Sequence, residues 1–412
     1  MPGGHGLARH EEGRVLLVPG GLPGDRVLVH REDRRAGAAR ATEWRLSKPS
    51  PDRIEPICEV HAHCGGCDLM GLERQAQERA KVGLLKDALM RTAGFSEAEL
   101  DGLTMTSAPQ SFAYRNRLRL QIDAGGRIGF YRKGSRELVQ PKRCHVAVPE
   151  IDRVLARLRK LTRRHPKALG GFAFVEVRVS TSSTSLYFEL KPQVSWVPVE
   201  STALLATLAQ DFLVRTSADR APQRYERFDL SERSYLYAVP GGFTQVNWAV
   251  NRLLVERVVG LASTAGSTDF IDLYSGSGNF SIPLLAAGLT GVGVEANAAA
   301  VAAASLAARE QKLPGRFVSG DALEYAKQAA RRGAKFELVL LDPPRSGIKQ
   351  GLEHVAALAP SHLALISCDP VTFARDLRGL LALGFCIQHL EAFDMFPQTH
   401  HLESLAWLKR AA

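Results

Sequence analysis

The second half of the chain alternates short apolar segments with segments rich in alanine and leucine, and no other feature restricts the fold as strongly. The pattern begins at about Gly241. Strands are predicted at Asp269–Tyr274, Gly291–Glu295, Phe317–Gly320, Phe336–Leu341, Leu363–Ser367, Cys386–Phe393 and Leu402–Leu408, and helices at Ala298–Glu310, Ala322–Arg332 and Val371–Leu383. Strands that alternate with helices build a mostly parallel sheet covered on both faces, so a doubly wound α/β domain is expected over residues 241–412.

The first 240 residues lack this alternation, and two smaller units are expected there. Residues 1–52 contain strand candidates at Arg14–Val18 and Arg26–Val29 around a Gly- and Pro-rich turn, which is typical of a small β-barrel, closed or open. The Pro-rich segment Ser47–Glu55 marks a boundary. A central α+β domain is expected over residues 53–240, with helices at Leu72–Ala93 and Ile151–Arg164 and strands within Phe112–Asp123, Phe174–Ser180 and Ser185–Leu190.

The chain is basic, with a formal net charge of +10 over 412 residues. This charge suits a polyanionic partner but also an ordinary basic protein, and it does not separate the two by itself. Aromatic residues interleaved with arginines in Phe112–Asp123 favour RNA, because bases stack on rings and phosphates pair with guanidinium groups. No apolar run reaches the ~20 residues of a membrane span and no signal peptide is recognised, so a cytoplasmic protein is expected.

A glycine-rich loop, D-L-Y-S-G-S-G-N-F-S, follows the first predicted strand of the α/β domain. Glycines let the backbone approach a ligand closely, and Glu295 at the end of the next strand can accept hydrogen bonds from ribose hydroxyls. The spacing departs from G-x-G-x-x-G, the pattern for a dinucleotide, and so favours S-adenosylmethionine over NAD. Asp321, after the third strand, suits the edge of an adenine.

Three further residues are expected in the same crevice because each lies at the end of a predicted strand. Asp342 stands in L-D-P-P-R, where Arg345 can bind a phosphate or orient a carboxylate. Cys368, in I-S-C-D-P, precedes a helix whose dipole is expected to give the thiol thiolate character. Glu403, close to His400 and His401, can remove a proton from carbon. Cys386, in contrast, is predicted to be a small buried hydrophobe.

Four other cysteines predict a metal site. Cys58, Cys64 and Cys67 form a C-x5-C-x2-C pattern, and Cys144 stands alone downstream. Four thiolates suit a [4Fe–4S] cluster, and zinc is the alternative because four-cysteine zinc sites also contain C-x2-C. The irregular spacing favours iron–sulfur. In principle a histidine can replace one thiolate, the candidates being His61, His63 and His145.

The motifs S-C-D-P, D-P-P-R, T-H-H-L-E and F-T-Q-V-N (Phe243–Asn247) together resemble the RNA uridine-5-methyltransferase family. The similarity extends over nearly the whole chain and is to the branch that has a TRAM module and an iron–sulfur cluster and that modifies 23S ribosomal RNA. It implies a class I, Rossmann-like methyltransferase domain, a TRAM module at the N-terminus and a monomeric enzyme that binds RNA. By this resemblance Cys368 is the nucleophile, Glu403 the base, the cluster ligands are Cys58, Cys64, Cys67 and Cys144, and the S-adenosylmethionine site is lined by Gln245, Tyr274, Asn279, Glu295, Asp321 and Asp342.

The implied chemistry explains why a cysteine and a carboxylate are paired. Addition of the Cys368 thiolate to C6 of uracil makes C5 nucleophilic, so that C5 can take the methyl group. Glu403 then removes the C5 proton, and the thiolate is expelled. Asp342 or Gln245 is expected to orient the uracil, which must leave any base stack to reach the crevice.

Some positions depart from the family pattern, and other functions stay open. The first strand usual in a TRAM module is not recognised, Ser275 stands where many members have Cys, and Asp369 stands where many have Asn. The substrate can instead be a transfer RNA uridine. An amino-methyltransferase that uses D-P-P-R in place of N-P-P-Y would need no nucleophilic cysteine. The last alternative is a non-catalytic RNA-binding or assembly protein.

Overall fold

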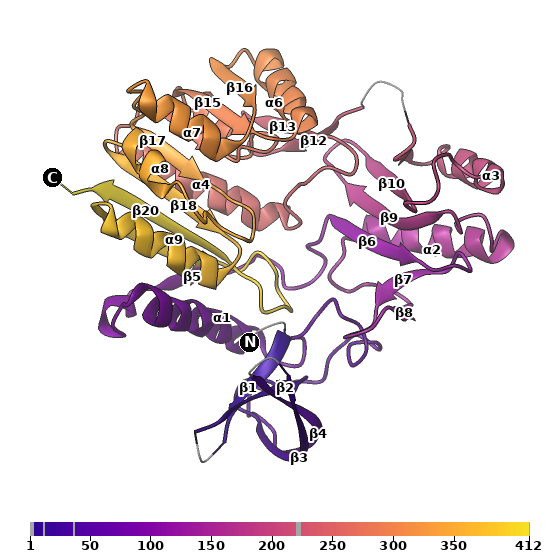
Figure 1. Ribbon diagram of the computed structural model, residues 1–412. Helices are drawn as coiled ribbons and strands as arrows, with labels where there is room; N and C mark the ends of the chain where they lie inside the picture. The colour runs from indigo at the N-terminus through magenta and orange to yellow at the C-terminus, as the bar shows by residue number, and fades with distance from the viewer. Residues whose placement is uncertain (1–3, 11–12, 36–37, 220–223, 412) are drawn as a thin grey trace.

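The computed structural model describes residues 4–10, 13–35, 38–219 and 224–411. Three parts, each built on its own sheet, follow one another along the chain (Figure 1). The C-terminal part carries the orange and yellow elements, the central part extends to the right of it, and the N-terminal sheet lies below both. Among the described residues, no helix combines the length and the apolar character needed to cross a membrane.

The C-terminal domain is built on an eight-stranded sheet with the order β16-β15-β14-β17-β18-β20-β19-β5. Its strands are β14 (Asp269–Leu273), β15 (Thr290–Glu295), β16 (Gly315–Ser319), β17 (Leu338–Leu341), β18 (His362–Ser367), β19 (Phe385–Phe393) and β20 (Glu403–Arg410), with β5 (Thr104–Thr106) at one edge. The first five of these run parallel, and β20 is antiparallel to both of its neighbours. The expected doubly wound sheet is therefore present, with an antiparallel strand inserted next to β18.

Both faces of this sheet are buried, as expected when helices cover each face. Leu341 and Leu365 belong to the core on one face, and Leu340 and Ile366 belong to the core on the other. The covering helices are α4 (Trp248–Thr264), α5 (Ser281–Ala286), α6 (Ala298–Glu310), α7 (Ala322–Arg331), α8 (Leu352–Leu358) and α9 (Pro370–Ala382). Helices α6, α7 and α9 agree with their predicted ranges to within a residue or so, whereas no range was predicted for α4, α5 or α8.

The central part contains a six-stranded sheet of order β11-β10-β9-β6-β7-β8. Its strands are β6 (Arg117–Ile122), β7 (Ile128–Tyr131), β8 (Leu138–Val139), β9 (Phe172–Val179), β10 (Thr184–Leu190) and β11 (Leu213–Thr216), and its helices are α2 (Pro149–Arg164) and α3 (Val199–Leu208). In β6 the leucines point into the core and the arginines lie on the other face, as predicted. A separate hairpin of β12 (Glu226–Asp229) and β13 (Tyr235–Ala238) leads into the C-terminal domain.

The N-terminal part is a four-stranded sheet of order β1-β2-β4-β3. Its strands are β1 (His5–Arg9), β2 (Val15–Pro19), β3 (Arg26–Arg35) and β4 (Ala38–Lys48). Only β2 and the start of β3 were predicted. The strands β3 and β4 are long and charged, so a hydrophobic pattern does not reveal them, and β4 extends into the segment that was expected to be a linker.

Helix α1 (Arg74–Ala88) continues as one π-helical turn over Leu89–Ala93. Although it precedes the central sheet in sequence, it packs beside α9 on the C-terminal domain (Figure 1). Its Leu85 and Leu89 join the same core as Leu377 of α9. Residues that precede the C-terminal domain therefore complete one of its covering layers, and β5 likewise extends its sheet.

The prediction that Cys386 is buried is wrong. This cysteine lies near the start of β19, where alternate side chains face solvent, and its side chain is exposed. The preceding Phe385 is the residue that points into the core.

Candidate active site

Strand register brings Cys368 and Glu403 together. In the antiparallel pair of β18 and β20, Ser367 lies opposite Ser404. The residue after Ser367 is Cys368 and the residue before Ser404 is Glu403, so the same register places these two side chains level with each other. Asp342 follows β17, the neighbour of β18 on its other side. Two parallel strands and one antiparallel strand thus deliver three predicted site residues to one edge of the sheet.

The carboxyl groups of Glu403 and Asp342 lie in a poorly hydrated environment. Burial raises the pKa of Glu403 well above its usual value, and the nearby charge of Asp342 raises it further, while Arg345 acts in the opposite direction. Burial also raises the pKa of Asp342 to about 7. Two close carboxylates resist ionising together, so at neutral pH the pair holds a proton more readily than two isolated acids would.

The Cys368 thiol does not have the thiolate character that was expected in the free protein. Burial raises its pKa to about 11, and the charges of Glu403 and Asp342 raise it as well. Arg345 opposes this shift through its charge and through a hydrogen bond to the thiol. The helix that follows is present, but its first amides at Val371 and Thr372 donate to the Asp369 side chain rather than to sulfur. Desolvation therefore exceeds the effect of the helix dipole.

The glycine-rich loop is held against the end of β15. The amides of Tyr274 and Ser275 both donate to the carbonyl oxygen of Val294, at 3.0 Å each. Glu295 accepts a hydrogen bond from the Gly276 amide at 3.1 Å. Tyr274 has a φ of 72°, a left-handed conformation that is uncommon for a residue other than glycine. Such strain is found where the surrounding structure fixes a loop for a ligand.

Two of the predicted cofactor residues also have structural partners. Asn279 exchanges two hydrogen bonds with Asn251 of α4, at 2.8 and 3.0 Å, so its amide group is engaged by the protein. Asp321 caps α7 by accepting from the Glu324 amide at 2.8 Å. Its remaining carboxylate oxygen is free to accept from a ligand.

Asp272 is a buried carboxylate beside the same loop. One of its oxygens accepts from the Ser281 hydroxyl at 2.5 Å, and the other is buried without a partner. Burial raises its pKa to about 7, and the charges of Asp342 and Glu295 contribute to the shift. An unpaired buried oxygen next to Tyr274 is suited to a ligand that carries positive charge or N–H donors.

Gln245 is buried on a loop that the central domain holds in place. The guanidinium of Arg178, on β9, is buried and donates to the carbonyl oxygens of Val239 and Gly242. It also forms an ion pair with Glu226 at 2.9 Å. The central sheet thus fixes the backbone three residues before Gln245.

The four cysteines in the N-terminal half of the chain lie near one another and form no disulfide bonds. Cys58, Cys67 and Cys144 pack around Met70, Tyr114 and Val146. Burial raises the pKa of Cys67, and the charges of Cys144, Cys64 and Cys58 add to this effect. Within the described part of the chain, no three His, Cys, Asp or Glu side chains form a group that could hold a metal ion.

Comparison with known proteins agrees with this arrangement. The model of the family described as tRNA (Uracil-5-)-methyltransferase matches residues 220–317 and 321–411. A 23S rRNA (uracil(1939)-C(5))-methyltransferase RlmD of Aeromonas salmonicida is 31% identical over 420 residues, which cover 97% of this chain and 92% of that protein. The chain belongs to the RNA uracil-5-methyltransferase family. The RlmD protein of Photobacterium profundum is 32% identical over an alignment that covers 98% of this chain and 90% of that protein.

A solved structure of an RNA uracil-5-methyltransferase has the same fold. It is the Pyrococcus abyssi tRNA (uracil-54, C5)-methyltransferase in complex with S-adenosyl-L-homocysteine, with a TM-score of 0.74 and 25% identity. The match covers 98% of this chain and 100% of that chain. All three parts of the molecule, and not the C-terminal domain alone, therefore correspond to this family.

Two residues beside the candidate site carried no prediction from the sequence. Asp272 was quoted as the first residue of the glycine motif but was given no role, although an acidic residue inside an apolar strand itself indicates a functional position. Asn251 carried no motif, and its pairing with Asn279 depends on how α4 packs against the loop. His401 was noted only as a neighbour of Glu403. Burial lowers its pKa to about 4, and its neighbours His400 and Arg345 lower it further, so the ring stays neutral.

Proposed function

We propose that this enzyme transfers a methyl group from S-adenosylmethionine to C5 of a uridine in 23S ribosomal RNA through a covalent Cys368–C6 adduct. The observation that carries the proposal is the placement of Cys368 level with Glu403 on neighbouring strands, with Asp342 beside them. The register of β18 and β20 brings the nucleophile and the carboxylate to one edge of the sheet, as reactions at adjacent carbons of one ring require. An amino-methyltransferase has no use for such a pair.

The proposed reaction begins with loss of the Cys368 proton to solvent, which the positive charge of the Arg345 guanidinium favours. A bond forms between sulfur and C6, and the electrons of the C5–C6 double bond make C5 nucleophilic. C5 would take the methyl group of S-adenosylmethionine, whose S–CH3 bond breaks with its electron pair kept by sulfur, leaving S-adenosylhomocysteine. Glu403 accepts the C5 proton, the double bond re-forms, and the S–C6 bond breaks with its electron pair returned to sulfur.

The residues around the glycine-rich loop fit a bound S-adenosylmethionine. Asp272 has an unpaired buried oxygen, and Glu295 and Asp321 follow successive parallel strands where ribose and adenine are bound in this type of fold. A bare Cβ at Gly276 would meet no atom within 4 Å, so this side of the loop is open to a ligand. We place Gln245, Tyr274, Asn279 and Asp342 around the same ligand.

The relatives support 23S ribosomal RNA as the substrate. The curated proteins that match most of this chain, at about 30% identity, act by their names on uracil 1939 of 23S ribosomal RNA. The matching solved structure is by its title a transfer RNA enzyme. Mass-spectrometric mapping of both RNAs from cells lacking the protein distinguishes the two. Loss of one 5-methyluridine from 23S RNA supports the proposal, whereas a loss confined to transfer RNA contradicts it.

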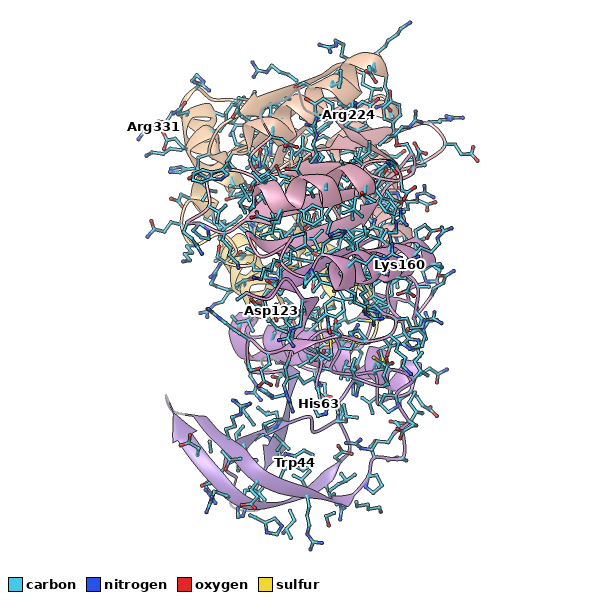
Figure 2. The ribbon with its side chains drawn as sticks, turned by 90° about the vertical axis from the view of Figure 1, so that its right-hand side faces the viewer. Trp44, His63, Asp123, Lys160, Arg224 and Arg331 are labelled. Carbon is cyan, nitrogen blue, oxygen red and sulfur yellow. The ribbon has the colours of Figure 1, made fainter. Side chains whose placement is uncertain are left out.

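A basic surface on the central domain supports RNA as the partner. Two adjoining grooves along α2 share Lys142, Arg159 and Arg163, and Lys160 and Arg164 line one of them. Figure 2 views the molecule from the side of α2, with Lys160 labelled on that face. Phosphates bound there would release counterions, so the affinity is expected to depend steeply on salt.

We expect that replacing Lys160, Arg163 and Arg164 together by alanine weakens RNA binding at low salt. The slope of log K against log salt should fall by roughly 2, at ~0.7–0.9 per lost phosphate contact. Fluorescence anisotropy with labelled RNA measures both quantities. The matched control is the triple alanine variant of Lys327, Arg331 and Arg332 at the end of α7. Equal losses in the two variants would mean that net charge alone, and not the α2 surface, binds RNA.

We also propose that Cys58, Cys64, Cys67 and Cys144 hold a [4Fe–4S] cluster. A zinc ion would need sulfurs about 2.3 Å from the metal and hence about 3.8 Å from one another. In a cubane cluster each cysteine binds a different iron, so the thiolates lie further apart. This suits four neighbouring thiols that, as described, do not gather around a single metal ion. In the cytoplasm, where we propose that this protein resides, glutathione and thioredoxin keep such thiols reduced.

Anaerobically purified protein is expected to absorb broadly near ~400 nm, as cysteine-ligated iron–sulfur centres do. The Cys144→Ser variant should lose most of its iron and this absorbance, while Cys386→Ser should retain both. Metal analysis that finds one zinc and no iron in the wild-type protein would overturn the cluster proposal.

A further inference from the structure

The segment from Asp394 to Leu402, here called the base loop, leads directly into Glu403. The hydrogen bonds and the ion pair that hold this loop come from residues 68–114, which lie outside residues 241–412. Tyr114 donates to the carbonyl oxygen of Pro397 at 2.8 Å. Buried Lys81 donates to that of Phe396 at 2.9 Å and pairs with Asp394.

Gln398 is the centre of this attachment. It is buried and has a φ of 69°, so its conformation must be maintained by its partners. Gln77 of α1 exchanges two hydrogen bonds with it, at 2.9 and 3.0 Å, one through the Gln398 amide and one through its side chain. The amides of Asp68 and Leu69 both donate to the Gln398 carbonyl oxygen, at 3.1 and 3.0 Å.

Asp68 makes the contact nearest to the base. Its carboxylate accepts from the His400 amide at 3.3 Å and lies 2.5 Å from Nδ1 of the same residue. The His400 ring lies against that of His401, with centroids 4.1 Å apart. Three residues after His400 comes Glu403, and Asp68 itself directly follows Cys67.

We infer that Asp68 is a positioning residue for the general base, through which the cysteine-bearing segment sets the place of Glu403. The inference rests on the proposed function. A base acts on the C5 proton only from hydrogen-bonding distance, and a small displacement lowers its rate steeply. Nucleophilic attack by Cys368 does not use the base loop, because Cys368 is carried by β18 and α9. Loss of Asp68 should therefore slow proton removal and leave adduct formation intact.

The experiment compares Asp68→Ala with the wild-type enzyme on two RNA substrates. In 5-fluorouridine RNA the base has no proton to remove, so adduct trapping on a denaturing gel reports attack and methylation alone. In uridine RNA, turnover also needs the base. We expect Asp68→Ala to trap 5-fluorouridine RNA within twofold of the wild-type rate. On uridine RNA it should turn over roughly tenfold more slowly and accumulate the adduct.

Two further variants control for loss of structure. Asp68→Asn keeps an acceptor for the His400 amide and should recover part of the turnover. Asp52→Ala removes a partly exposed carboxylate whose ion pair, with Arg79 at 2.8 Å, does not involve the base loop. This variant should behave as wild type. Equal slowing on both substrates, or unchanged turnover in Asp68→Ala, overturns the inference. If the wild-type enzyme traps no 5-fluorouridine RNA, the proposed function itself fails and the inference fails with it.

Discussion

Cys368→Ala is expected to abolish methylation and the covalent RNA adduct. Removing the nucleophile from a covalent mechanism commonly costs at least about 10⁴-fold in rate, because no other group activates the substrate. Transfer of a labelled methyl group to RNA measures the rate, and a denaturing gel measures the adduct. The thiol is only partly buried, so its loss should leave the fold intact and the variant should still bind RNA.

Cys386→Ala is the matched control for this prediction. It removes the same atom from an exposed position on β19 of the same sheet. Its activity should stay within twofold of wild type, and its stability within about 0.5 kcal/mol. Full turnover in Cys368→Ala would show that the chemistry needs no nucleophile, as in an amino-methyltransferase.

Glu403→Gln is expected to form the adduct and release it 10²- to 10⁴-fold more slowly, the range typical for loss of a general base. On uridine RNA the adduct should accumulate on a denaturing gel, whereas in the wild type it is transient. Glutamine has the same shape and carries no charge. Because burial raises the pKa of Glu403 in the folded state, stability falls as the pH rises from the ordinary glutamate pKa to the raised one and is not regained above it. The uncharged variant escapes this loss and should be at least as stable as wild type at pH 8.

The pH dependence separates the base from the nucleophile. The base must be ionised, and burial together with the charge of Asp342 raises the pKa of Glu403 well above its usual value, so release by the wild type should slow as the pH falls through this raised pKa. Glu403→Gln should lose this dependence. Formation of the adduct should instead speed up with rising pH, because the pKa of Cys368 is raised to about 11.

Glu353→Gln, which changes an exposed side chain on α8, is the control and should match the wild type. Normal release by Glu403→Gln would remove this residue from the role of base.

The α/β domain was predictable because its strands are buried on both faces and read as short apolar runs. Asp342, Cys368 and Glu403 were predictable for the same reason, since each stands at a strand end. Helix α4 was missed although Asn247 caps it and Val250, Leu254 and Val258 repeat with helical spacing. The three-residue strand β5 has no pattern to detect.

Contacts between distant parts of the chain could not be predicted from the sequence. Asp68 and His400 are 332 residues apart, and neither type of residue specifies the other. The pKa of Cys368 was predicted in the wrong direction because the helix dipole is local in sequence, whereas burial and the charge of Glu403 come from the assembled sheet. Desolvation is a property of the folded structure and not of a motif.

The covalent bond between Cys368 and uracil is the central claim, and peptide mass spectrometry after trapping with 5-fluorouridine RNA tests it most directly. Digestion with protease and nuclease should yield one cross-linked peptide that contains Cys368, carrying a methylated 5-fluorouridine nucleotide. A cross-link to another cysteine, or a methylated RNA with no cross-linked peptide, would contradict the account.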